Sequence, residues 1–297
     1  MATMQMKGVI PPMVTPYKEN GDVDYHAHGH NMELWNQSNL GGYLVLGSNS
    51  EAAYLTEDEK IEMIKVTVEK AKKDRTILAG TGMESTRETI SLTNKAADAG
   101  ADAALILTPF YYGGNMNDEA LIAFFSQVAD SVKIPVLIYN VTKFTHINIS
   151  ARAVAVLGRH PNIIGMKDSS GDIPQLVTFK SVVDDDFNLI VGTASAWYPA
   201  LTLGVRTGIM ALANIAPDGC VQVQDAYERG DHQEAVEVYE RLFPVNTAIT
   251  ATYGVPGLKY AADLLGYRGG FVRSPLLPVS EKERVQIKEI LKKAGLL

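Results

Sequence analysis

The sequence predicts an α/β protein, a (β/α)8 TIM barrel followed by a C-terminal helical extension. Short apolar runs alternate with helical patterns through residues 8–216, and this alternation is typical of parallel strands buried on both faces. Eight such units fit a closed barrel, which commonly takes about 250 residues, better than an open sheet. Since no linker rich in Pro, Gly or Ser divides the chain, we expect a catalytic barrel over residues 1–216 and a helical region over residues 217–297.

Each predicted strand is a short apolar run that ends in polar residues or glycine. The runs are shorter than typical helices, and turn residues bound them. In chain order the predicted strands cover residues 8–15, 42–47, 76–82, 103–109, 134–140, 163–167, 189–192 and 208–212.

Amphipathic segments between these runs predict the helices. Thr56 is followed by Glu59 at the spacing of a capping box, and Ser85 is a suitable N-cap residue. The predicted helices cover residues 24–38, a segment opening near 56, then 85–97, 118–131, 150–159, 173–182 and 196–203, and helical patterns then run from 218 to the end.

Composition narrows the function classes. The net charge is −7, and the sequence contains no cluster of basic residues, so we expect no nucleic-acid partner. Cys220 is the one cysteine, which excludes an intramolecular disulfide framework and suits a reducing compartment. The amino terminus has no apolar stretch of signal-peptide length, and no segment approaches 18 uninterrupted apolar residues. We therefore expect a cytoplasmic protein without a membrane partner.

The most informative residue is Lys167, which ends a short apolar run just before polar residues and glycine. In a barrel of this kind the catalytic residues lie where strands end and βα-loops begin. Burial there lowers the pKa of a lysine, as a Schiff-base nucleophile requires. The other strand ends supply tyrosine hydroxyls for proton transfer, and hydroxyl, amide and backbone donors suited to a carboxylate. This set favours imine formation with a 2-oxo acid.

Metal and nucleotide sites are less favoured. His26 and His30 share a helical face, but they lie in the first amphipathic segment, away from the strand ends. We interpret them as part of a solvated face. The Gly80-Thr-Gly82 segment lacks the third glycine of a dinucleotide-binding loop. We expect neither a metal nor a cofactor.

Three segments in this order resemble a known family: Gly47-Ser-Asn-Ser-Glu51, Tyr139-Asn-Val141 and Gly165-Met-Lys-Asp168. They are similar to the signature segments of the dihydrodipicolinate synthase/N-acetylneuraminate lyase family. These proteins are pyruvate-handling class I aldolases with a barrel fold, and they are usually tetrameric. The resemblance implies a homotetrameric lyase whose partner is a small 2-oxo acid, either pyruvate or a 4-hydroxy-2-oxo acid.

The resemblance also implies roles for individual residues. Lys167 would be the Schiff-base lysine and Tyr139 the proton-transfer tyrosine. Ser48 and Asn49 would hold the keto-acid carboxylate. Ser48 and Tyr111 would also act as a catalytic proton relay with Tyr139, and Tyr111 would reach a neighbouring subunit's site. The remaining expected substrate-binding residues are Ser169, Ser170, Gly192 and Asn214.

Within the family, five segments most resemble the 4-hydroxy-2-oxoglutarate aldolase branch. They are Gly80-Thr-Gly-Met-Glu-Ser-Thr86, Met166-Lys-Asp-Ser169, Ala211-Leu-Ala-Asn214, Gly254-Val-Pro-Gly-Leu-Lys259 and Gly266-Tyr-Arg-Gly-Gly270. Phe144 replaces the arginine that meets the aldehyde's carboxylate in the synthases, and Lys143 is no bidentate equivalent. The acidic pair typical of the sialic acid lyases is replaced by residues 193–195, Thr-Ala-Ser. Ser50 and Thr142 depart from the branch pattern, which has glycine and proline there.

We therefore predict a lyase that cleaves a 4-hydroxy-2-oxo acid, such as 4-hydroxy-2-oxoglutarate, to pyruvate and an aldehyde, or condenses these two. The alternatives within this class are 4-hydroxy-tetrahydrodipicolinate (dihydrodipicolinate) synthase and a 2-keto-3-deoxy sugar acid aldolase or dehydratase. The alternative from another class is a non-catalytic barrel that binds a keto acid.

Overall fold

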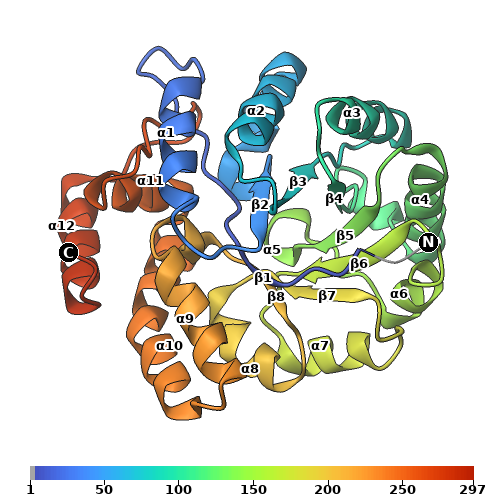
Figure 1. Ribbon diagram of the computed structural model, residues 1–297. Coiled ribbons are helices and arrows are strands. Elements are labelled where there is room, and N and C mark those ends of the chain that lie inside the picture. The colour runs from blue at the N-terminus through green and yellow to red at the C-terminus, as the bar shows by residue number, and fades with distance from the viewer. Residues whose placement is uncertain (1–3) are drawn as a thin grey trace.

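The computed structural model describes residues 4–297 and confirms the predicted barrel (Figure 1). Residues 1–3 lie outside the described residues; they include the start of the predicted domain 1–216 and of the amino terminus that is expected to lack a signal peptide. Eight parallel strands pair in the order β1-β8-β7-β6-β5-β4-β3-β2, and a bridge between Pro12 and Leu44 brings the end of β1 beside β2. The strands are β1 (Gly8–Ile10), β2 (Gly42–Val45), β3 (Thr76–Gly80), β4 (Ala103–Leu107), β5 (Val136–Asn140), β6 (Ile163–Asp168), β7 (Asn188–Val191) and β8 (Thr207–Ile209).

Some strands are shorter than predicted because their last residues enter the loops at the carboxyl end of the barrel. β1 ends at Ile10 rather than at residue 15. Pro11 and Pro12 follow it, and proline has no N–H with which to continue the ladder. β8 ends at Ile209, and a short 3-10 helix, η5 (Ala211–Asn214), takes the place of its predicted end.

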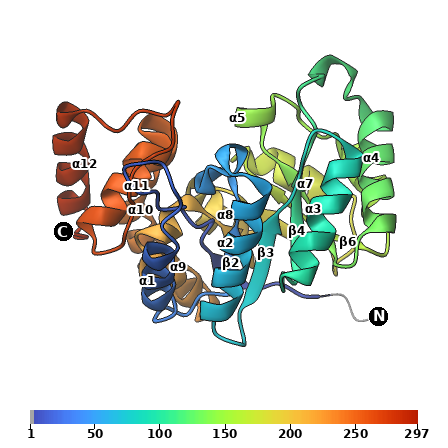
Figure 2. The ribbon, with the colours of Figure 1, turned by 90° about the horizontal axis from the view of Figure 1, so that it is seen from above.

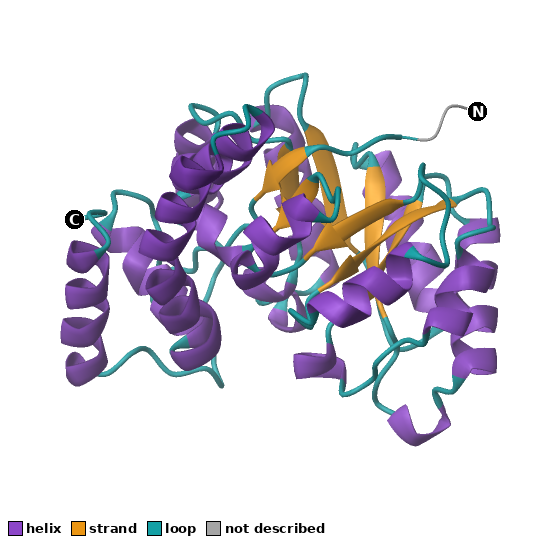
Figure 3. Cartoon of the chain, turned by 90° about the horizontal axis from the view of Figure 1, so that it is seen from below, coloured by secondary structure: helices purple, strands orange, loops and turns teal. Residues whose placement is uncertain are grey.

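Helices surround the strands (Figure 3). The capping box at Thr56 and the N-cap at Ser85 are both present, as the sequence predicts. The short helix α5 (Thr142–Thr145) is an additional element that the periodicity did not predict. The helices after successive strands are α1 (Tyr25–Trp35), α2 (Glu57–Lys70), α3 (Thr86–Asp98), α4 (Asp118–Ser131), α5 (Thr142–Thr145) with α6 (Ala151–Leu157), α7 (Ile173–Lys180), α8 (Trp197–Thr202) and α9 (Pro217–Glu228).

The C-terminal helices lie to one side of the barrel (Figure 2). They are α10 (His232–Thr247), α11 (Gly254–Leu264) and α12 (Glu281–Lys293), with a π-helical turn, η6 (Ala248–Thr252), between the first two. The expectation of helix to the end of the chain is wrong for residues 265–280, where Gly266, Gly269, Gly270 and Pro275 interrupt helical structure. α9 packs against α8 and β1. The division at residue 216 stays a prediction.

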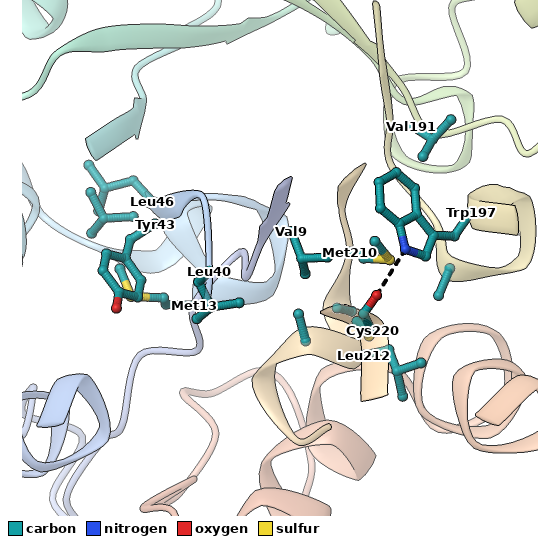
Figure 4. Close-up of a cluster of buried hydrophobic side chains, with 14 of the residues drawn as sticks. Val9, Met13, Leu40, Tyr43, Leu46, Val191, Trp197, Met210, Leu212 and Cys220 are labelled. Atoms are coloured by element: carbon teal, nitrogen blue, oxygen red, sulfur yellow. Dashed lines mark hydrogen bonds between the residues drawn. The ribbon is translucent and has the colours of Figure 1, made fainter. Parts of the chain in front are cut away.

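The core has two layers. Inside the barrel, every strand contributes at least one apolar side chain, among them Ile10, Leu44, Leu78, Leu105, Leu137, Ile164, Ile190 and Ile209. A larger cluster fills the space between strands and helices (Figure 4). There the buried Trp197 donates its indole N–H to the carbonyl of Cys220 at 3.0 Å, and Cys220 is itself buried, as a packing residue is. Within residues 4–297, no helix is both long and apolar enough to cross a membrane.

Candidate active site

Lys167 and Tyr139 are direct neighbours on adjacent strands, because Tyr139 of β5 pairs with Lys167 of β6. An irregularity precedes this pair. Val136 pairs with Ile163 but Leu137 pairs with Gly165, so Ile164 is one extra residue in β6. Side chains alternate between the faces of a strand, and a shift of one residue reverses every later side chain. The bulge at Ile164 therefore puts Lys167 on the inner face of the barrel, together with Tyr139.

The surroundings of Lys167 suit an amine nucleophile. Lys167 is 3% exposed, and its Nζ lies 4.3 Å from the centre of the Tyr139 ring. Burial lowers the pKa of Lys167, while the Tyr139 hydroxyl partly opposes that shift. A lower pKa leaves more of the neutral amine near neutral pH, and only the neutral amine attacks a carbonyl.

Gly192 follows β7 and leaves room for the lysine. A β carbon at this position would lie 2.9 Å from Lys167 Cε and 1.8 Å from Ser169 Oγ. Ser169 Oγ is buried and has no hydrogen-bond partner among residues 4–297. It is therefore a polar group beside Lys167 that remains free for a ligand.

Ser48 lies in the turn after β2. This turn is a 3-10 helix, η1 (Ser48–Ser50), and the Ser48 hydroxyl is 3.4 Å from that of Tyr139. The half-buried Asn49 is the next residue in the turn. The Ser50 hydroxyl donates to the carbonyl of Met13 and accepts from Gly47 N at 3.1 Å. Ser50, one of the two departures from the branch pattern, thus joins this turn to the segment after β1.

Tyr111 lies in the loop after β4 and is 75% exposed. The Glu84 carboxylate accepts from the backbone N–H groups of Phe110 and Tyr111, at 3.0 and 2.9 Å, which fixes the path of this loop. The Tyr111 ring packs edge-on against Tyr112, with their centres 5.1 Å apart. In a single chain Tyr111 is thus a surface residue, and its contribution to a neighbouring site stays a prediction.

Two expected substrate-binding residues are already engaged with the protein. The Ser170 hydroxyl donates to Asp168 Oδ2 at 2.5 Å. Asn214 is fully buried and bonds to backbone groups through both its oxygen and its nitrogen, including Val14 N and Pro12 O at 3.0 Å each. These contacts indicate structural roles in the loops, and substrate contact by either residue stays a prediction.

The position of Phe144 bears on substrate choice. Phe144 lies in α5, which Thr142 begins, and its side chain is half exposed. The adjacent Lys143 donates to the backbone carbonyl of Thr250 in η6 at 2.7 Å. The ammonium group of the residue next to Phe144 is therefore bound to the C-terminal region.

The possible metal ligands among the described residues do not form a cluster. Across residues 4–297, no set of three or more His, Cys, Asp or Glu side chains is placed to hold a metal ion. His30 approaches the carbonyl of Gly266 at 3.4 Å, and His26 is exposed. The absence of a cofactor stays a prediction.

Two polar residues at the strand ends, Asp168 and Glu51, lie next to the site although the sequence patterns gave them no role in it. Asp168 points away from the barrel interior and accepts from Asn140 Nδ2 at 2.8 Å, which joins the ends of β5 and β6. Glu51 ends the turn of Ser48 and is buried, with Lys259 of α11 as its partner at 2.7 Å. A lone lysine within the apolar run of α11 was the available signal for this pair.

Comparison with known proteins covers nearly the whole chain. The model of the Dihydrodipicolinate synthetase family matches residues 5–294. A 4-hydroxy-tetrahydrodipicolinate synthase from Archaeoglobus fulgidus is 34% identical, over 98% of this chain and 99% of its own length. The enzyme of the same name from Methanothrix thermoacetophila is 33% identical, over 97% of this chain and 96% of its own length.

Solved structures agree with these sequence comparisons. The dihydrodipicolinate synthase of Acinetobacter baumannii, described as chloride inhibited and complexed with pyruvate, superposes with a TM-score of 0.94 at 30% identity, covering 99% of this chain and 100% of that one. The Thermotoga maritima synthase also gives 0.94, at 26% identity, with the same coverage. These proteins are all named as synthases, so they confirm the family that the sequence patterns predict but give no support to the 4-hydroxy-2-oxoglutarate aldolase branch.

Proposed function

Because this chain belongs to the dihydrodipicolinate synthetase family, we propose that it joins pyruvate to an aldehyde through an imine on Lys167. Its family makes it a lyase of the class I aldolase type. The observation that carries the proposed mechanism is the inward-facing, buried Lys167, with its Nζ 4.3 Å from the Tyr139 ring centre.

The proposed reaction proceeds in four steps. The neutral Lys167 amine attacks the keto carbon of pyruvate, and water leaves to give a protonated imine. Loss of a proton from the methyl group gives an enamine, because the imine accepts the electron pair. The enamine carbon attacks the aldehyde carbonyl, and hydrolysis then frees Lys167. Tyr139 passes protons to and from the reacting oxygens, and Ser48, at 3.4 Å from its hydroxyl, continues the relay.

The turn after β2 supplies groups for the carboxylate of the 2-oxo acid. Ser48 and Asn49 are adjacent in this turn and remain partly exposed, unlike the buried Ser50. Hydroxyl and amide donors there match a carboxylate, which accepts hydrogen bonds at both oxygens. We assign the pyruvate carboxylate to these two side chains.

Two reactions fit a site of this kind. The names of the relatives favour 4-hydroxy-tetrahydrodipicolinate synthase, with aspartate semialdehyde as the aldehyde. Phe144 counts against this aldehyde, because it offers no charge for the carboxylate of aspartate semialdehyde. An arginine fork makes two charge-assisted hydrogen bonds to such a group, and Lys143 is instead bound to the Thr250 carbonyl. The second candidate is therefore cleavage of a 4-hydroxy-2-oxo acid, whose second carboxylate would bind the Ser169 hydroxyl beside Lys167, which has no partner in the described part of the chain.

Borohydride trapping tests the imine. Incubation with pyruvate and borohydride should add a permanent mass to the chain, and peptide mapping should place it on Lys167. A mass gain on another lysine, or no gain, would refute the mechanism. A second measurement decides between the two reactions. The kcat/KM for the condensation of aspartate semialdehyde with pyruvate is compared with the kcat/KM for the cleavage of 4-hydroxy-2-oxoglutarate, and the larger value identifies the substrate.

We also propose that the protein is a cytoplasmic homotetramer in which Tyr111 completes the site of a neighbouring subunit. Its exposure of 75% leaves the ring available for such a contact. Subunits carrying Tyr111→Phe, mixed and exchanged with subunits carrying Lys167→Ala, should recover activity that neither variant has alone. No recovery after proven exchange would show that the site is not shared.

A further inference from the structure

A buried ion pair lies directly behind the turn that carries Ser48. Lys259 Nζ is 2.7 Å from Glu51 Oε1, and both side chains are 1% exposed. The other contacts of the ammonium group go to two backbone carbonyls, Thr15 at 2.8 Å and Phe271. The three donors of the lysine are therefore all used.

Both oxygens of the Glu51 carboxylate are also engaged. While Oε1 meets Lys259, Oε2 accepts from the backbone N–H of Arg273 at 2.9 Å. The Tyr17 ring lies against two cations of the cluster, with its centre 4.5 Å from Lys259 Nζ and 4.3 Å from the Arg273 guanidinium. The cluster thus joins the loop after β1, the turn after β2, α11 and the segment before α12.

The backbone of Glu51 connects this cluster to the proposed site. Glu51 adopts φ 53°, ψ 35°, a left-handed conformation that is unusual for a residue with a side chain. Its N–H donates to the carbonyl of Ser48 at 3.3 Å, and the Ser48 hydroxyl lies 3.4 Å from that of Tyr139. The neighbouring Ser50 carbonyl accepts from the Thr15 hydroxyl at 2.8 Å. Movement of Glu51 would therefore move Ser48.

Net stability is a poor explanation for such a pair. The desolvation of two buried charges offsets much of their attraction, and replacing both by apolar groups is often neutral. Burial also lowers the pKa of Lys259 to about 8, which shows the cost of keeping its charge. A buried charge with fixed partners does define geometry, because any shift of either segment leaves a polar group unpaired.

We propose that Lys259 and Glu51 are positioning residues that hold the Ser48–Ser50 turn, and with it Ser48 and Asn49, in the geometry that binds the carboxylate of the 2-oxo acid. This inference rests on the proposed function, because it assigns the pyruvate carboxylate to that turn. It also gives the C-terminal region an indirect part in substrate binding, through the Ser48–Ser50 turn.

The test compares charge removal at the buried pair with the same change at an exposed pair. Glu51→Gln keeps the size of the side chain, and the double variant with Lys259→Met removes both charges. Lys133→Met is the matched control, because Lys133 pairs with Asp98 at 2.6 Å on the surface, where the side chains are 58% and 64% exposed. Folding is checked by circular dichroism and thermal unfolding, and pyruvate binding by the concentration dependence of borohydride trapping.

We expect the two buried-pair variants to need about tenfold to 10²-fold more pyruvate for half-maximal trapping, the range that weakened hydrogen bonds to a charged carboxylate give. Trapping at saturating pyruvate should still occur on Lys167, because the variants leave the lysine itself in place. In turnover assays, the KM for pyruvate should rise by a larger factor than kcat falls. The control should trap pyruvate as the wild type does.

Three other results would contradict either the positioning role or the proposed function. Folded buried-pair variants with unchanged half-maximal pyruvate would overturn the positioning role while leaving the proposed function intact. Loss of folding in both variants would assign the pair to stability and would also overturn it. A wild-type chain that takes up no pyruvate would instead refute the proposed function itself.

Discussion

Gly192→Ala should inactivate the protein by displacing Lys167 rather than by unfolding it. The added methyl carbon would lie 1.8 Å from Ser169 Oγ, 2.8 Å from Ser169 Cβ and 2.9 Å from Lys167 Cε. Carbon atoms in contact prefer a separation of about 3.5 Å or more. Rotation of the serine relieves the first contact, but the other two require Ser169 and Lys167 to move apart from the new methyl group.

The size of the effect follows from these contacts. Overpacking of this kind typically costs about 1–3 kcal/mol of stability, which a chain of this size tolerates. A shift of about 1 Å at a reacting group costs about 10²-fold in rate. We therefore expect kcat/KM to fall by about 10²-fold or more, with only a moderate loss of thermal stability.

The assay pairs borohydride trapping and kcat/KM measurements with thermal unfolding. Gly29→Ala in α1 is the control, because its β carbon would meet only Lys70 Cε, at an ordinary 3.6 Å. Alanine is favoured over glycine within a helix by about 0.5–1 kcal/mol, so this variant should be as stable as the wild type or more so, and equally active. A Gly192→Ala protein with the kcat/KM of the wild type would show that the lysine does not need this space.

Four further predictions follow from the described side chains. Lys167→Ala should abolish imine trapping, and Lys167→Arg should not restore it, because a guanidinium stays protonated; trapping by the arginine variant would exclude Lys167 as the nucleophile. Tyr139→Phe should lower kcat by about 10²–10⁴-fold with little change in thermal unfolding, and a near-normal kcat would leave Tyr139 a packing role only. Phe144→Arg should raise kcat/KM for aspartate semialdehyde by about tenfold or more through a bidentate contact to its carboxylate; an unchanged value would place that carboxylate elsewhere. Burial lowers the pKa of His28 from 6.5 to about 4, so the unfolded chain takes up the proton first and stability should fall as pH drops through that window, by about 3 kcal/mol at most. Urea unfolding at pH 7 and pH 4.5 measures this loss, and His28→Gln, which carries no titrating ring, should remove most of it.

The sequence allowed the barrel and its principal residues to be predicted because their signals are local. A run of apolar residues that ends in Lys167 defines a strand end, and eight such runs in order define the architecture. Tyr139 was found in the same way, at the end of β5. The place of each residue along the barrel thus follows from its place along its own strand.

The direction of Lys167 could not be predicted from the same pattern. The inner face receives this side chain only because Ile164 is an extra residue in the pairing of β6 with β5. An apolar run buried on both faces shows no alternation, so the sequence carries no sign of the bulge. Contacts between distant segments were equally hidden: Lys259 and Glu51 lie 208 positions apart, and neither sequence segment specifies its partner.

The ion pair between Glu51 and Lys259, behind the Ser48 turn, also affects the order in which the chain can fold during its synthesis. Translation delivers Glu51, Tyr139 and Lys167 long before Lys259 and Arg273. A nascent chain that ends with β8 (Thr207–Ile209) already contains every strand and both principal residues of the site. In that chain the Glu51 carboxylate still lacks the ammonium group and the backbone N–H that it meets in the finished fold. The barrel can close early in synthesis, but the turn beside its lysine receives its final partners only when the C-terminal helices emerge from the ribosome.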